Sequence, residues 1–200
     1  RYVGDQAVAD MVKTHHPEVV GAGRVQAWVV GSGGGDSAGE ELAAAVDDRV
    51  PVVVDADALQ HVDSRFSSPA VLTPHAGELA AMLGEKRESV EARPLHFARE
   101  AAREYGATVL LKGRRTVIAR PDGRARVNTT GTAWLATAGA GDVLGGVIGA
   151  LLAAGLTPYD AASVGAWLHG AAGTLASDGG PVVAGWVAAA LPAVVAGLLS

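Results

Sequence analysis

The stretch VPVVVDADAL at residues 50–59 places an almost unbroken apolar run directly before two carboxylates. A short apolar run bounded by polar residues is typical of a strand that is buried on both faces of a sheet. The same pattern predicts strands at 25–30, 70–72 and 108–111, each followed by a polar or glycine-rich segment. Stretches of helical period separate these strands, which indicates an α/β protein with a mostly parallel sheet and helices on both of its faces.

The rest of the chain supplies the helices and one hairpin. Residues 116–119 and 125–127 flank the turn PDGR and predict a β-hairpin, because Pro-Asp-Gly provides the turn dihedral angles between two β-rich runs. The expected helices cover residues 37–46, a short stretch that ends at Leu83, about 89–105, 141–152, 158–177 and 182–199.

Composition limits the class of protein. The 200 residues include 16 Lys and Arg against 21 Asp and Glu, which gives a net charge of −5, and 49% of the residues are hydrophobic. Such a chain folds around a core, and we expect one domain over residues 1–200. The acidic balance and the lack of a basic run argue against a nucleic-acid partner. The absence of cysteine excludes disulfides, thiolate metal sites and cysteine nucleophiles.

The only candidate for a membrane span is the uncharged run 182–199, which Gly185 and Pro192 interrupt. A buried C-terminal helix is the better interpretation of this run, and the chain opens on no secretory signal pattern. The expectation is therefore a cytoplasmic protein without a membrane partner.

Ligands of open α/β sheets bind beyond the carboxyl ends of the strands. Five polar segments could line one crevice there: GSGGGD at 31–36, DADAL at 55–59, TPHAGE at 73–78, KGRRT at 112–116 and ATAGAGDVLGG at 136–146. In the last segment Gly139 and Gly141 leave room for a phosphate at the start of a helix, where backbone N–H groups bind anions. A carboxylate repels phosphate, so Asp142 is better explained as a base that acts on a hydroxyl than as a ligand of the phosphate. It could also be a helix N-cap.

The other motifs each admit a purely structural interpretation. His75 and Glu78 stand three residues apart and are either functional or a capping arrangement. Asp55 and Asp57 are more simply explained as caps of the turn after the strand. His169 lies in a helix of Gly and Ala, where a lone histidine is more often a satisfied packing residue, so it stays outside the predicted site.

KGRRT brings Lys112 and two arginines close to a strand end, which suits nucleotide phosphates but is also common in solvated turns. The chain contains no G-x-x-x-x-G-K-S/T phosphate loop and no G-x-S-x-G elbow. GSGGGD lacks the G-x-G-x-x-G pattern, which leaves a dinucleotide-dependent dehydrogenase as a minor option.

Taken together and in order, these segments resemble the ADP- or ATP-dependent NAD(P)H-hydrate dehydratases of the ribokinase-like superfamily. LTPHAGE at 72–78 and LATAGAGDVLGG at 135–146 carry the resemblance most specifically. It implies a three-layer ribokinase-like fold and a repair enzyme that regenerates NADH or NADPH from the hydrated nicotinamide.

The resemblance also implies roles for individual residues. Asp142 would take the proton of the ring hydroxyl, whose oxygen attacks the terminal phosphoryl group, and loss of phosphate would restore the dihydronicotinamide. Gly33, His75 and Asp142 would contact the hydrate, and Glu78 would help to hold Mg²⁺ through water. The nucleotide ADP or ATP would contact Lys112, Gly113, Arg114, Arg115, Thr116 and Gly141.

The chain departs from the family pattern in its first glycine turn, which is GSGGG instead of G-P-G-L-G, at Ala140, where serine is common, and at Trp134. The family domain usually begins earlier, so we expect that an N-terminal segment precedes Arg1. Alternatives to the dehydratase are a kinase of hydroxymethylpyrimidine or thiazole alcohols and an inactive nucleotide-binding protein. A homo-oligomer such as a tetramer is expected.

Overall fold

The computed structural model describes residues 1–199, which form a six-stranded mixed sheet with the strand order β1-β2-β3-β4-β5-β6. Strands β1 to β4 run parallel, β5 is antiparallel to β4, and β5 and β6 form the hairpin at one edge. The strands are β1 (Trp28–Val30), β2 (Val52–Val54), β3 (Ala70–Leu72), β4 (Thr108–Leu111), β5 (Thr116–Ala119) and β6 (Ala125–Asn128). The sheet confirms the predicted mostly parallel α/β architecture and its edge hairpin.

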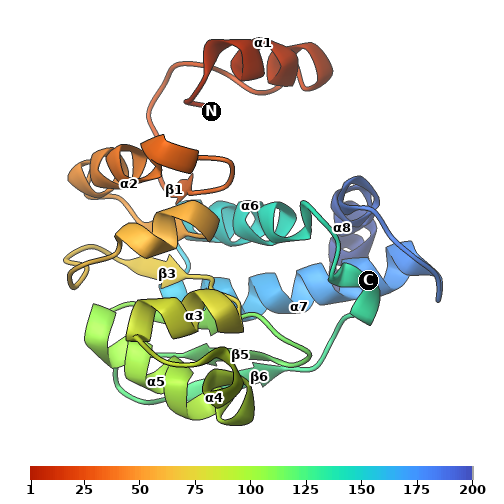
Figure 1. The fold of residues 1–200 in the computed structure, drawn as a ribbon. Helices are drawn as coiled ribbons and strands as arrows, with labels where there is room; N and C mark the ends of the chain where they lie inside the picture. Colours follow the sequence, from red (N-terminus) through yellow and green to blue (C-terminus); the bar gives the residue numbers. More distant parts are fainter. Residues whose placement is uncertain (200) are drawn as a thin grey trace.

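Helices cover both faces of the sheet and complete three layers (Figure 1). One face packs on α2, α3 and α5, and the other face packs on α6 and α7. The α-helices are α1 (Gln6–His15), α2 (Ala38–Asp47), α3 (Ala76–Leu83), α4 (Arg87–Ala92), α5 (Pro94–Tyr105), α6 (Ala140–Ala153), α7 (Pro158–Ser177) and α8 (Ala184–Leu199). The short 3₁₀ helices are η1 (Gly35–Ser37), η2 (Ala56–His61) and η3 (Ala133–Leu135).

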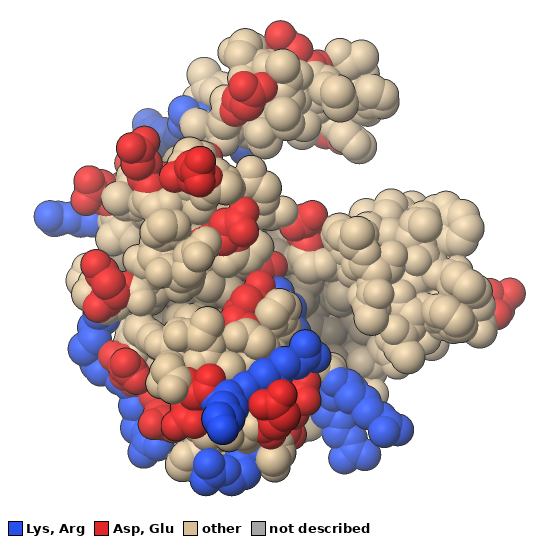
Figure 2. Space-filling view, viewed as in Figure 1, with Lys and Arg blue, Asp and Glu red and all other residues tan. Residues whose placement is uncertain are grey.

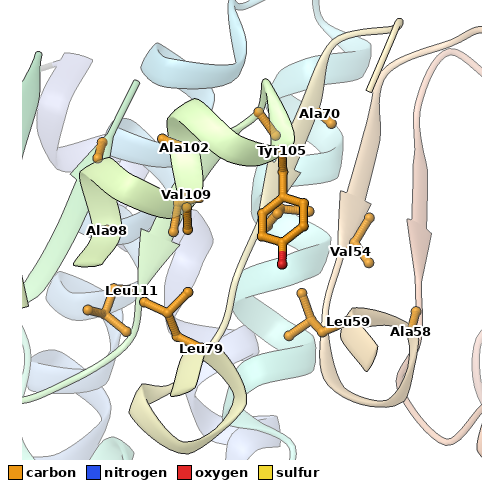
Figure 3. Packing of buried hydrophobic residues seen from close by; sticks show 14 of the residues in the cluster. Val54, Ala58, Leu59, Ala70, Leu79, Ala98, Ala102, Tyr105, Val109 and Leu111 are labelled. Carbon is orange, nitrogen blue, oxygen red and sulfur yellow. The ribbon is translucent and has the colours of Figure 1, made fainter. Parts of the chain in front are cut away.

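Strand alternation divides the core in two. Val53 and Leu110 face α6 and α7, whereas their neighbours Val54 and Val109 pack toward α3 and α5. Because both faces are covered, every residue of β2, β3 and β4 is buried, which explains why these strands are continuous apolar runs in the sequence. Figure 3 shows Tyr105 among these side chains, and its hydroxyl donates a hydrogen bond to the Met82 carbonyl at 2.8 Å.

The helices differ from the expected ones in two places, and the first difference corrects a prediction. The single helix expected over about 89–105 is divided into α4 and α5, because Pro94 lacks an N–H and Arg93 before it leaves the helical region at φ −135°. No helix was expected before the first strand, yet α1 begins after Asp5, whose carboxylate accepts the N–H groups of Ala7 and Val8. In Figure 1, α1 stands apart from the layers of the sheet.

Helix α8 is not the buried helix that the sequence predicted. Val187 is buried against α7, but Trp186 and Leu198 are each 58% exposed. Figure 2 shows this end of the molecule as a lobe almost without charge. Within residues 1–199, none of the helices combines the length and the apolar character that crossing a membrane requires.

Candidate active site

The carboxyl ends of the parallel strands meet at one edge of the sheet, as the sequence predicted. Asp55 follows β2, Lys112 follows β4, and the segment after β3 pairs with the segment after β4 through a parallel bridge between His75 and Lys112. Helix α6 begins at the same place. A Cβ atom added to Gly141 would lie 3.3 Å from Asp55 Oδ2 and 3.9 Å from Lys112 Nζ. Segments far apart in the sequence therefore form one polar cluster.

An ion pair lies at the centre of this cluster. Lys112 Nζ donates to Asp55 Oδ1 at 2.6 Å and lies 3.8 Å from Glu78 Oε2. The side chain of Asp55 is only 9% exposed and that of Lys112 is 25% exposed. Asp55 makes no side-chain capping bond in η2. The interpretation of Asp55 as a turn cap was therefore wrong, and sequence reasoning missed its pairing with Lys112.

His75 and Glu78 form a capping box at the start of α3. His75 Nδ1 accepts the Glu78 N–H at 3.0 Å, and Glu78 Oε2 accepts the His75 N–H at 2.6 Å. The capping alternative is thus confirmed, but the same bonds also fix both side chains beside Lys112. The His75 side chain is 59% exposed and is accessible to a ligand.

The turn GSGGGD after β1 depends on left-handed glycines. Gly31, Gly33 and Gly35 have φ values of +114°, +67° and +47°. Asp57 holds this turn, because its Oδ2 accepts the Gly35 N–H at 3.0 Å and its own N–H donates to the Gly31 carbonyl at 3.2 Å. Gly33 is exposed, and a Cβ atom there would meet nothing within 4 Å. The backbone at Gly33 is therefore open to a ligand.

The start of α6 has the features of an anion site. Gly139 is the N-cap at φ +81°, so Asp142 is not the N-cap but lies in the first helical turn. Among the described residues, the N–H groups of Gly141 and Asp142 have no acceptor, and the exposed Asp142 carboxylate makes no hydrogen bond. Gly141 with its free amide therefore lies beside the Asp55–Lys112 pair, and Asp142, with a free amide and a free carboxylate, is its neighbour in the first turn of α6.

The rest of KGRRT leads from this cluster into the hairpin. Gly113, Arg114 and Arg115 are exposed, and Thr116 is half-buried at the start of β5. Neither Arg114 nor Arg115 pairs with any acceptor within residues 1–199. Both guanidinium groups are consequently exposed next to the polar cluster. This exposure is compatible with both earlier interpretations, a solvated turn and a pair of phosphate ligands.

A cavity of about 480 Å³ adjoins the cluster between η2 and α3. It extends from His75 and Glu78 over Asp57, Gln60 and Met82. Its volume lies in the range of small-molecule sites. The candidate site therefore has space for a ligand beside the predicted residues.

His169 differs from the satisfied packing histidine that the sequence predicted. It is 9% exposed, and its Nε2 has no hydrogen-bond partner among the described residues. Burial lowers the pKa of its imidazole below the usual 6.5, although contact with the Ala140 backbone partly opposes this. The sequence could not predict this environment of His169. His169 lies on α7, whereas the backbone that it contacts, at Ala140, belongs to α6.

This environment predicts an acid-dependent loss of stability. The lowered pKa means that the folded chain takes up this proton at a lower pH than the unfolded chain. The contribution of His169 to stability is therefore fully present above about pH 6.5 and is lost as the pH falls. We expect the free energy of unfolding to drop less between pH 7.5 and 5.5 in His169→Leu than in the unmodified chain, by at most about 1.4 kcal/mol per pH unit. Urea unfolding at both pH values measures this difference, and equal drops would refute it.

Comparisons with known proteins identify relatives of this chain. The family model described as NAD(P)H-hydrate dehydratase matches residues 2–189. The chain is 43% identical over 176 residues to an ADP-dependent (S)-NAD(P)H-hydrate dehydratase of Neisseria meningitidis, covering 82% of this chain and 60% of that protein. It is 45% identical over 196 residues to a bifunctional NAD(P)H-hydrate repair enzyme of Mycobacterium leprae, covering 90% and 40%.

A solved structure has the same fold. The ADP/ATP-dependent NAD(P)H-hydrate dehydratase from Bacillus subtilis, co-crystallised with ATP and Mg²⁺, superposes with a TM-score of 0.86 at 28% identity, covering 96% of this chain and 76% of that one. The chain thus spans less than two thirds of the length of both relatives compared above by sequence.

Proposed function

Since the chain belongs to the NAD(P)H-hydrate dehydratase family, we propose that it takes part in nicotinamide nucleotide repair. The proposed reaction is the dehydration of the hydrate of NADH or NADPH, driven by ADP, which gives AMP and phosphate, or by ATP, which gives ADP and phosphate. One observation carries the proposal: the Asp55–Lys112 pair, Glu78 and the free amides of α6 meet at the carboxyl edge of the sheet, where Asp142 lies in the first turn of α6.

The terminal phosphates of the nucleotide would bind at the start of α6. The N–H groups of Gly141 and Asp142 need acceptors, and the helix dipole favours an anion there. Lys112 supplies a cation to this position, and Arg114 and Arg115 supply two more at its rim. Gly113 and Thr116 would complete the nucleotide contacts.

The residues present also fit Mg²⁺ carried by the nucleotide. Mg²⁺ prefers oxygen ligands, keeps several waters and is commonly held by one or two carboxylates together with phosphate oxygens. Glu78 and Asp55 present two carboxylates around one ammonium group, and Glu78 would act through water. When bound, the ion would neutralise charge on the transferred phosphoryl group.

Asp142 would act as the base of the reaction. Its free carboxylate takes the proton from the hydroxyl of the hydrated ring, and the oxygen then attacks the terminal phosphorus as the bond to the nucleotide breaks. The ring carbon next loses the phosphate, and a proton leaves the neighbouring carbon, which restores the double bond. Lys112 and the α6 amides would stabilise the phosphoryl oxygens during the transfer.

The hydrate would lie between the glycine turn and α3. Gly33 offers an open backbone to the ligand, and the exposed His75 ring is held by its capping bond in a fixed orientation. The adjoining cavity leaves space for the rest of the dinucleotide. The cytoplasm is the proposed place of the reaction, because ADP, ATP and nicotinamide nucleotides are found there.

Recovery of dihydronicotinamide absorbance from purified NADH hydrate or NADPH hydrate, with Mg²⁺ and either ADP or ATP, tests the proposal. We expect recovery together with release of free phosphate, and the active nucleotide identifies the donor. An alcohol kinase would instead release a stable phosphate ester from a hydroxymethylpyrimidine or thiazole alcohol. Nucleotide binding without turnover of any of these compounds would indicate an inactive binding protein.

The apolar end of the molecule supports a homo-oligomer, with a tetramer as one form. Large apolar side chains are exposed on α7, on α8 and on the segment between them: Val164, Trp167, Leu175, Val183, Trp186, Val195 and Leu198. Exposed apolar surface of this kind marks protein interfaces, and the lack of charge in this lobe favours a second copy of the chain (Figure 2).

A single substitution tests this interface. Trp186→Glu places a charge at one of the most exposed apolar side chains of α8 and should shift the chain toward a monomer, as measured by light scattering. Val127→Glu, at an exposed position of the hairpin, is the control that should not change the mass. A monomeric unmodified chain would contradict the assembly.

A further inference from the structure

Asp55 is the most buried carboxylate of the polar cluster, and the proposed reaction uses it only as one of two carboxylates near the Mg²⁺ of the nucleotide. We propose that Asp55 is a positioning residue for nucleotide binding, which holds the Lys112 ammonium over the start of α6. This inference rests on the proposed function, because it concerns the phosphate side of that site. Three features carry the proposal: the short ion pair, the position of Gly141, and the fact that the neighbouring carboxylates bind other groups.

The ion pair restricts a side chain that is otherwise flexible. A lysine ammonium stands on a four-carbon stem and is strongly hydrated, so an unpaired Lys112 would move its charge between the site and solvent. Asp55 follows the buried strand β2 and is itself fixed, and its Oδ1 lies 2.6 Å from Lys112 Nζ. The carboxylate thus holds the ammonium in place before any ligand arrives.

Asp55 holds the Lys112 ammonium next to the position proposed for the phosphate. The other carboxylate oxygen of Asp55 lies 3.3 Å from the point where a Cβ of Gly141 would be, and Lys112 Nζ lies 3.9 Å from the same point. The N–H group of Gly141 has no acceptor within the described residues. A phosphate oxygen that accepts this N–H can therefore also reach the ammonium.

Neighbouring carboxylates cannot replace Asp55. Glu78 is 3.8 Å from Lys112 Nζ, and its Oε2 already accepts the backbone N–H of His75 at 2.6 Å. Asp57 accepts the N–H of Gly35 and supports the glycine turn instead. Without Asp55, Lys112 would keep only the longer contact to Glu78.

A double-mutant cycle on the dissociation constant of ADP, measured by calorimetry with Mg²⁺, tests the proposal on the full chain. Asp55→Asn keeps the shape and removes the charge, and we expect binding to weaken about 10- to 100-fold, which corresponds to the loss of a charged hydrogen bond. Lys112→Met should weaken binding at least as much. If Asp55 acts through Lys112, the double variant should bind like Lys112→Met alone.

Two further variants separate positioning from a structural role. Asp55→Glu keeps the charge and should bind ADP within about threefold of the unmodified chain, whereas a residue needed only for packing would tolerate the larger Glu less well than Asn. Asp160→Asn is the matched control, because Asp160 pairs with a different cation, Arg126, at 2.9 Å, and the dissociation constant for ADP should stay unchanged in this variant. Melting temperatures of all variants show that they fold.

The outcomes are distinct. Unchanged binding in Asp55→Asn, or effects of the two substitutions that multiply in the double variant, would overturn the positioning role and leave the proposed function intact. Failure of the unmodified chain to bind either ADP or ATP would overturn both. If Asp55→Asn does not fold, the comparison of Asp55→Glu with Lys112→Met decides, because positioning predicts near-normal binding in the first and weak binding in the second.

Discussion

Asp142→Asn should lower the turnover of the hydrate by about two to four orders of magnitude, the usual contribution of a positioned proton-transfer group. The substitution keeps the size of the side chain and removes the base. ADP binding should stay the same or become tighter, since the carboxylate lies beside the free amides of α6 and repels phosphate. A fall in kcat without weaker nucleotide binding is therefore the expected pattern.

Steady-state kinetics with NADH hydrate, together with calorimetry of ADP, measures both quantities. Asp160→Asn is a matched control, because Asp160 is also an acidic residue in the first turn of a helix but pairs with Arg126 at 2.9 Å at the opposite edge of the sheet. The control should keep its turnover. Full activity in Asp142→Asn would rule out Asp142 as the base.

Gly31→Ala should cause the largest loss of stability. An added Cβ would lie 1.9 Å from the backbone oxygen of Asp55 and 2.8 Å from the Cβ of Ala58, and Gly31 also has a φ of +114°. A backbone oxygen cannot move aside without displacing η2. We expect the free energy of unfolding to fall by about 4 kcal/mol or more, or the chain not to fold at all.

Gly33→Ala is the control for this effect. Gly33 also has a positive φ, of +67°, but a Cβ there would contact nothing within 4 Å. Gly33→Ala should therefore lower the free energy of unfolding only by the cost of a left-handed backbone at alanine, about 1–2 kcal/mol. Urea unfolding of both variants measures the difference, and equal losses would show that the close approach of β1 to the Asp55 backbone does not matter.

Much of the fold could be predicted because its physical causes are local. The strands 70–72 and 108–111 and the helix 158–177 have their predicted bounds, since apolar runs flanked by Gly, Pro or polar residues leave few alternatives. The break at Pro94 was also readable from the sequence, but the charged pattern on both sides of it favoured one helix. The exposure of α8 could not be predicted, because the sequence of an apolar helix does not show whether the helix packs in the core or lies at the surface.

The site could be predicted only in part. Glycines and polar residues after strands indicated which segments would meet, and the structure brings His75, Glu78, Lys112 and Gly141 together. The pairing of Asp55 with Lys112 joins residues 57 positions apart, and it depends on which strands become neighbours in the sheet. The roles of Gly33, Asp142 and the two arginines are proposals. These residues are open to a ligand, but their contacts within the described chain do not identify that ligand.

The separation of Asp55 and Lys112 has a consequence for the order of folding. The two residues become neighbours only after β3 has inserted between β2 and β4, because these strands are adjacent only through it. Parallel pairings of this kind close long loops and form slowly. The proposed nucleotide site would thus be completed late, so ADP would bind the finished sheet and should slow its unfolding without accelerating its formation. The proposed nucleotide would therefore also lengthen the lifetime of the folded molecule.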